Sequence, residues 1–185
     1  ALTLEFGARA DWVERDPDTA VVGSRDFSNL SFSASALWDI GSQWSLGLAL
    51  SHSERAPATQ ELYSNIEAQN PSELVIHAAT GVIEVGDARL DQEASQNIDL
   101  SLNWNREGVW AGATLFYNHF DDYIGLFNTG AEFEGTEIYA YEQDDAVFYG
   151  VELQATIALA QMASGELLLE VFGDSISASF DNNGK

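Results

Sequence analysis

The chain has 185 residues, 45% of them hydrophobic, and carries seven Lys and Arg residues against thirty Asp and Glu, a formal net charge of −23. The hydrophobic content argues against disorder. The scarcity of cationic side chains argues against nucleic acid as a partner, because phosphates need Lys and Arg as counter-charges. The acidic surface either attracts cations or only maintains solubility, and the absence of Cys excludes disulfides, thiolate metal sites and thiol nucleophiles.

Seven stretches of the chain alternate apolar and polar residues with period two, which predicts strands with one apolar and one polar face. In the first, Leu2, Leu4 and Phe6 alternate with polar neighbours. The predicted strands lie near residues 2–13, 27–39, 44–55, 94–105, 109–126, 146–160 and 166–180. The phase of the last changes at Gly173, which predicts a β-bulge there.

The phase within each strand also predicts which side chains share a face of the sheet. One set of leucines and valines is expected on the apolar face: Leu46, Leu48, Leu100, Leu102, Val151 and Leu153. We therefore expect an all-β, antiparallel up-and-down meander.

Strand length and connection length both favour a membrane barrel over a soluble sheet. Several strands span 11–13 residues, close to the 9–11 or so that cross a bilayer when tilted. Connections near 14–26, 56–92 and 127–145 are long, whereas those near 40–43, 105–108 and 160–165 are short, the asymmetry typical of outer-membrane barrels. The alternative is a soluble β-sandwich or an adhesin-like binding module without a transport role.

The five tryptophans give a second indication of a membrane. Trp38 and Trp44 flank one short turn, Trp104 and Trp110 flank the next, and Trp12 ends the first strand at the opposite rim. Amphipathic rings at strand ends form the interfacial girdles of membrane barrels.

Seven strands are too few to close a large barrel, so the chain is expected to be a partial sector of a transmembrane β-barrel. Ala1 starts within a strand and residues 181–185 are loop-like, which predicts that residues 1–185 are a fragment of a longer chain. Two open edges and a bare apolar face predict that the isolated fragment self-associates.

Four local patterns resemble the C-terminal barrel half of TonB-dependent receptors. They are Ser53–Pro57 with Glu61–Tyr63, Leu90–Asn97, Phe116–Asn118 with Asp121–Ile124, and Ala146–Leu153. The resemblance covers roughly residues 51–155, and the flanking strands fit it.

This resemblance implies a Gram-negative outer-membrane barrel of about 22 strands with a plugged lumen, which imports a scarce nutrient with energy delivered by the TonB protein. The implied partners are outer-membrane lipid, the plug domain of the same parent chain, and TonB, which contacts a region N-terminal of the barrel. The plug and the remaining strands are then absent from this chain. Nothing in the sequence has the spacing of a catalytic motif, so an enzyme is not expected.

One external loop resembles that of receptors associated with zinc or haem uptake. The resemblance rests on His77–Gly81 and Glu84–Asp87, with residues 66–76 as an insertion. His77 is expected to bind the ligand or a metal, with Glu84 and Asp87 as helpers, because imidazole and carboxylate capture divalent ions. Zinc and haem are thus candidate bound groups, and the solvated loop residue is the alternative.

Three further residues are expected to face the lumen or the plug. Arg55 continues the polar phase near the outer mouth, where Glu61 follows as a carboxylate partner, and Glu152 lies on the polar face beside Gly150. Acidic residues at 121–122 and 142–145 resemble sites for Ca²⁺, although ordinary solvated charge explains them as well.

Overall fold

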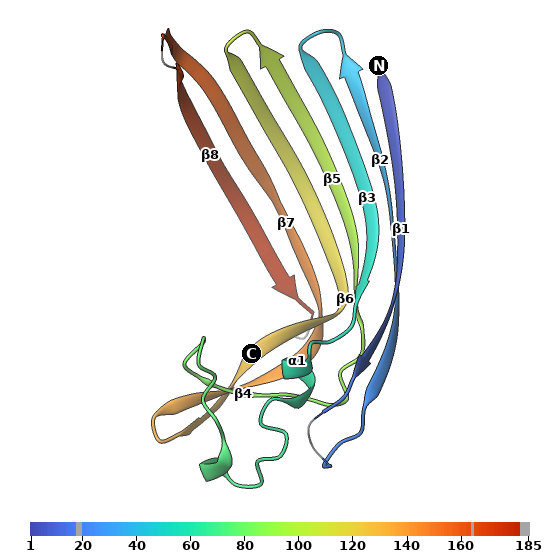
Figure 1. Ribbon diagram of the computed structural model, residues 1–185, viewed down its shortest axis with the longest axis vertical. Helices are drawn as coiled ribbons and strands as arrows, with labels where there is room; N and C mark the ends of the chain where they lie inside the picture. The colour runs from blue at the N-terminus through green and yellow to red at the C-terminus, as the bar shows by residue number, and fades with distance from the viewer. Residues whose placement is uncertain (18–19, 164, 182–185) are drawn as a thin grey trace.

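The chain forms one long, curved antiparallel sheet in the computed structural model, which describes residues 1–17, 20–163 and 165–181 (Figure 1). Its long strands are β1 Leu2–Arg15, β2 Arg25–Ile40, β3 Trp44–Arg55, β5 Glu93–Arg106, β6 Val109–Phe133, β7 Thr136–Met162 and β8 Gly165–Phe180. Each pairs antiparallel with the next in chain order. The predicted meander is confirmed, and the soluble β-sandwich is wrong, because the described strands belong to a single sheet. Residues 182–185, predicted to be loop-like, lie outside the described part.

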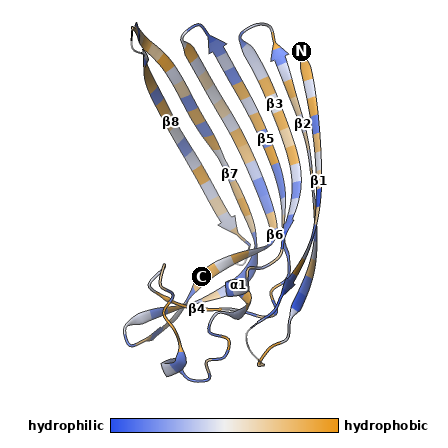
Figure 2. Cartoon of the chain, in the orientation of Figure 1, coloured by the Kyte–Doolittle hydropathy of each residue, from blue (hydrophilic) through white to orange (hydrophobic). Residues whose placement is uncertain are grey.

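The strand register confirms the predicted apolar face. Leu46 lies opposite Leu102, Leu48 lies opposite Leu100, and the rows continue across β6 to Val151 and Leu153. Directly opposed residues of antiparallel strands point to the same side. Figure 2 shows the resulting alternation of hydrophobic and hydrophilic bands along the long strands.

Three of the four tryptophans near the short turns lie on this apolar face. Trp44 and Trp104 are directly opposed, with ring centroids 6.1 Å apart, and Trp38 shares their phase. Trp110 lies opposite Asn105, one residue out of that phase, and is therefore on the polar face. Its assignment to a membrane-facing girdle is wrong, because neighbouring residues of one strand point to opposite sides.

The connection near 127–145 is not the long loop that the sequence predicts. β6 and β7 continue as a paired hairpin and meet at a two-residue turn, Glu134–Gly135, in which both residues have positive φ (50° and 78°). That conformation matches the twist of a β-hairpin. The pairing shifts between Phe120 and Tyr123, and again between Asn128 and Ala131, so the bulges broke the alternation on which the strand prediction depended.

The β-bulge predicted at Gly173 is also wrong. Gly173 pairs in unbroken register with Leu153, and the irregularity in this strand pair lies between Ala158 and Ala160 on β7. As a result the apolar residues at the end of β8, such as Phe180, lie on the polar face. There Phe180 packs against Phe148, with ring centroids 6.1 Å apart.

The long connection between β3 and β5 is folded. It contains the helical turn α1 Thr59–Tyr63, the 3₁₀ turn η1 Pro71–Glu73 and the short strand β4 Ile83–Val85, which pairs in parallel with β7 at residues 138–140. Across the described residues, neither helical element nor any other helix has the length and apolarity to cross a membrane.

The hydrophobic core lies under this connection rather than along the sheet. Its buried cluster consists of Phe27, Ala56, Leu62, Leu90, Ile124 and Tyr141. Along the strands, by contrast, apolar side chains such as Phe6 are exposed, at 75% for that residue. The packed end therefore fixes the loop in place, whereas the apolar sheet face has no protein covering it.

Candidate functional site

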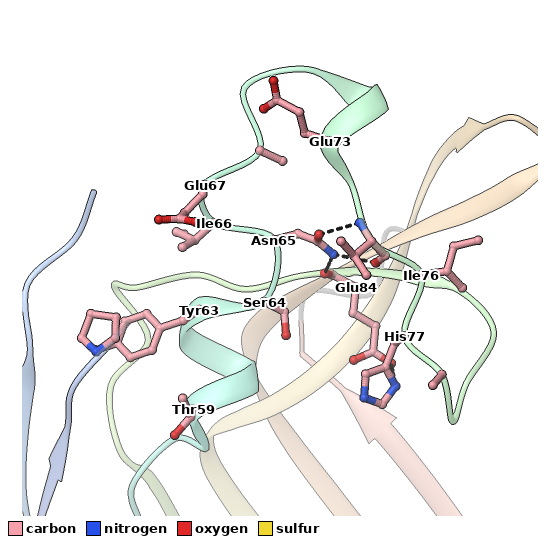
Figure 3. Close-up of a pocket in the computed structure, with 14 residues that line it drawn as sticks. Thr59, Tyr63, Ser64, Asn65, Ile66, Glu67, Glu73, Ile76, His77 and Glu84 are labelled. Atoms are coloured by element: carbon pink, nitrogen blue, oxygen red, sulfur yellow. Dashed lines mark hydrogen bonds and ion pairs between the residues drawn. The ribbon is translucent and has the colours of Figure 1, made fainter. Parts of the chain in front are cut away.

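A pocket of about 770 Å³ lies in the folded connection between β3 and β5 (Figure 3). Most of its wall comes from residues 63–68, which precede the 3₁₀ turn η1, from Glu73, the last residue of that turn, and from residues 75–78, which follow it. The remaining lining residues are Pro17, Thr59 and Glu84. Its volume falls in the range of small-molecule sites, roughly 300–1,000 Å³.

Glu84 on β4 is the most buried charged side chain of this wall, at 1% exposure. Thr80 donates a hydrogen bond of 2.6 Å to Glu84 Oε1, and Tyr141 on β7 donates one of 2.7 Å to Oε2. His77 Nδ1 lies 3.3 Å from Oε1 (Figure 3). One carboxylate oxygen of Glu84 is thus bound by the loop, and the other is bound by β7.

The partners of Glu84 keep it ionised despite its burial. Burial by itself raises the pKa of a carboxyl group, but the hydrogen bonds from Thr80 and Tyr141, with His77 nearby, outweigh it and hold the pKa of Glu84 below its ordinary value. The same contact acts oppositely on the phenol, because burial and the adjacent negative charge both raise the pKa of Tyr141.

Asn65 joins the two halves of the loop. Its side chain accepts a hydrogen bond from the Val75 amide at 2.8 Å and donates to the carbonyl oxygens of Val75 and Glu84 at 3.0 and 2.8 Å (Figure 3). The φ of Asn65 is 53°, a left-handed conformation that Asn tolerates better than most residues. One side chain therefore fixes the pocket wall to β4.

Gly86 allows β4 to dock against α1. Its amide donates to the Ser64 carbonyl at 2.8 Å, and the following amide, of Asp87, donates to the Glu61 carbonyl at 3.0 Å. A Cβ at position 86 would lie 2.7 Å from backbone atoms of Leu62 and Tyr63. Only glycine permits this approach, which positions Glu84 two residues earlier.

The structure brings two of the three predicted ligand-binding residues together. His77 and Glu84 are adjacent in the pocket wall, whereas Asp87 lies outside it and forms an ion pair with Arg89, 2.7 Å from Oδ2 to Nη2. Within the part of the chain that the structure describes, no three His, Cys, Asp or Glu side chains are arranged to hold a metal ion.

Arg55 lies at the base of the loop between two carboxylates. Its guanidinium is 2.8 Å from Glu61 Oε2 and 3.1 Å from Glu93 Oε2. Glu61 also accepts a hydrogen bond from the Ala58 amide at the start of α1, and Glu93 accepts one from the Ile124 amide of β6. The cluster joins β3, α1, β5 and β6 where the loop meets the sheet.

Glu152 lies apart from the loop, well along β7. In the strand register it lies directly opposite Thr114 of β6 and Asp174 of β8, on the polar face of the sheet. At its neighbour Gly150, an added Cβ would meet the Ser175 carbonyl and, at 2.8 Å, the Phe116 ring. The missing side chain at Gly150 therefore makes room for the β8 backbone and the Phe116 ring of this same chain.

Sequence reasoning missed three residues that organise the pocket: Asn65, Thr80 and Tyr141. The sequence predicts a connection at Tyr141, whereas in the structure this residue lies on β7, paired with Leu126 of β6 beyond the bulge. Asn65 and Thr80 lie in irregular backbone, where no periodicity indicates the direction of a side chain. An Asn in a long loop was the one signal that a left-handed residue occurs there.

The fold and its two ends define a class of protein: a sector of a transmembrane barrel with tight turns at one end and a structured loop at the other. Residues 1–184 match the family described as "TonB dependent receptor-like, beta-barrel". The chain belongs to this family, which consists of transport receptors of the Gram-negative outer membrane and not of enzymes.

Solved structures of receptors share the fold. The siderophore receptor PirA from Pseudomonas aeruginosa has 22% identity and a TM-score of 0.65, covering 97% of this chain and 32% of that one. The FrpB iron transporter from Neisseria meningitidis has 19% identity and a TM-score of 0.63, covering 97% and 24%. The copper transporter OprC has 20% identity and a TM-score of 0.64, covering 86% and 25%. The chain thus spans a third or less of these proteins, and the matches show a shared fold without selecting the zinc or haem branch.

Proposed function

We propose that this chain is the pocket-bearing sector of an outer-membrane receptor that imports a metal ion, haem or a metal chelate with energy from TonB. In this proposal the loop of residues 56–92 captures the ligand at the external mouth. The observation that carries it is the pocket of about 770 Å³, built by a loop that is folded and anchored to the barrel. Loops of this length without a role in binding are usually disordered.

The proposed partners follow from the same assignment. The exposed apolar face, which includes Leu100 at 42% exposure, would contact outer-membrane lipid. The polar face with Glu152 would face a plug domain of the parent protein, and TonB would act through a region outside this chain. Arg55 and Glu61 form an ion pair with each other at the base of the loop. If either residue contacts the plug, the contact would therefore lie where the loop meets the sheet.

The experiment is growth of cells that carry the full-length receptor, with limiting zinc, haem or a ferric chelate as the supply. Replacement of residues 66–82 by a short Gly–Ser linker removes most of the pocket wall and should abolish receptor-dependent growth. His77→Ala should weaken it, because His77 Nδ1 lies beside Glu84 in the wall. His119→Ala is the matched control, since His119 pairs with Asp121 outside the pocket.

Surface abundance measured on intact cells separates loss of binding from loss of folding. Unchanged uptake by the linker variant at normal abundance would refute capture by this loop. Loss of uptake in the linker variant but not in His77→Ala would keep the loop as the capture site and reject His77 as a contact.

A further inference from the structure

The charged groups of the pocket wall are almost all of one sign. The lining contains three carboxylates, Glu67, Glu73 and Glu84, and one imidazole, that of His77; among the described residues it contains no Lys or Arg (Figure 3). The wall is therefore negative whether or not His77 carries a proton. Two of these carboxyl groups are held ionised: hydrogen bonds from the Gln69 amide and Asn70 lower the pKa of Glu73, as those from Thr80 and Tyr141 do for Glu84.

The arginines near this end of the molecule are engaged elsewhere. Arg15 donates to the Pro57 carbonyl, Arg25 pairs with Asp91, Arg55 with Glu61 and Glu93, and Arg89 with Asp87. None of these four lines the pocket. An anionic ligand entering it would meet no Lys or Arg among the described lining residues, and the net charge of −23 adds to the repulsion.

Size and ligand geometry limit the ligand further. The pocket is far larger than a bare ion needs, and the described residues offer no group of three metal-ligating side chains. Apolar side chains, among them Ile66, Val75 and Ile76, share the wall with the carboxylates. This combination suits an organic molecule with an apolar body and a cationic group.

We infer that, of the ligands proposed above, the pocket takes a positively charged metal chelate and discriminates against anionic chelates. The inference rests on the proposed function, since it names the ligand class of the same loop. The mixed wall would hold the apolar body, and the carboxylates would attract the cationic group on entry.

The test reads the pocket's charge preference directly, in the full-length receptor. Ala78→Cys introduces a thiol at an exposed lining residue, and this sector contains no other Cys. Two methanethiosulfonate reagents are compared, one with a trimethylammonium group and one with a sulfonate; the thiolate attacks the sulfenyl sulfur, a disulfide forms and methanesulfinate leaves. The ratio of the two rates, divided by the same ratio for a free thiol, reports the local potential.

The neighbouring Ala79→Cys is the matched control, because Ala79 is exposed but does not line the pocket. We expect the cation-to-anion rate ratio at position 78 to exceed that at 79 by roughly sevenfold, the effect of a potential difference of one kT per unit charge on reagents that differ by two charges. Glu67→Gln, at an exposed lining carboxylate, should lower the ratio, and Glu134→Gln on the β6–β7 turn should not.

A ratio at position 78 equal to or below that at 79, or one unchanged by Glu67→Gln, would overturn the cationic-ligand inference. That result leaves the capture proposal standing if the linker variant still abolishes uptake. Conversely, a high ratio with normal uptake by the linker variant would show a cation-selective pocket that does not serve transport, so the two failures are distinguishable.

Discussion

Tyr141→Phe should loosen the pocket loop while leaving the barrel strands unchanged. The substitution removes one hydroxyl, the donor of the 2.7 Å hydrogen bond to Glu84 Oε2, and keeps the ring in the buried cluster. Glu84 is 1% exposed, so water cannot readily replace the lost donor. A buried carboxylate then loses a charge-assisted hydrogen bond.

Hydrogen bonds to charged groups contribute about 1.5–3 kcal/mol, and Thr80 still donates to the other oxygen of Glu84. We therefore expect the free energy of local opening of the loop to fall by about 1.5–3 kcal/mol. The matched control is Tyr139→Phe, because the Tyr139 hydroxyl makes only an exposed contact of 3.4 Å with Glu137. Its effect should stay within about 0.5 kcal/mol.

Amide hydrogen exchange on the receptor in detergent measures this opening. The informative amides are those of Gly86 and His77, which donate within the loop, and amides in the middle of β5 serve as the reference. Unchanged protection of Gly86 and His77 in Tyr141→Phe would refute the idea that Glu84 joins the loop to β7. Equal loss of protection in β5 would show a global effect instead.

The pH dependence of the same exchange follows from the lowered pKa of Glu84. A carboxyl group whose pKa is depressed in the folded state stabilises the fold above its ordinary pKa, which for glutamate is about 4.3. This stabilisation disappears as the pH falls through the lowered value. Loop protection should therefore decline below about pH 4.3, and in Tyr141→Phe, which has lost one of the groups that lower the pKa of Glu84, the decline should be smaller and should end at a higher pH.

Three further outcomes are expected. Gly86→Ala should destabilise the loop by about 1–3 kcal/mol through its clash with the α1 backbone, whereas Gly23→Ala, with open space around it, should be near neutral in the same exchange measurement. Arg55→Ala should cost about 2–3 kcal/mol, reduced from the value for a fully buried pair because the Arg55 side chain is 43% exposed. Arg55→Lys should recover part of this loss, and a cost of Arg55→Ala below about 0.5 kcal/mol would show that the pair with Glu61 contributes little. The isolated 185-residue chain should self-associate in plain buffer, and a stable monomer in sedimentation without detergent would contradict the exposed edges and apolar face.

The sequence by itself determined the sheet and its faces. Alternation with period two needs no tertiary context, since successive side chains of a strand point to opposite sides, and so the positions of Leu46 and Leu102 on one face followed directly. The prediction broke down where one extra residue shifts the phase. β6 and β7 stay paired past the expected ends at residues 126 and 146, through register shifts after Phe120 and after Asn128, and at Gly173 the apolar phase of the sequence changes without a change of register.

Only the tertiary structure decided which loop residues meet. His77 and Glu84 were both candidates in the sequence, but so was Asp87, and sequence distance does not separate a carboxylate that faces the pocket from one that pairs with Arg89. Thr80 and His77 lie near Glu84 in the chain, but its third partner, Tyr141 on β7, is 57 residues away. Contacts of this kind depend on how irregular backbone packs against the barrel end, and no local pattern of residues encodes that packing.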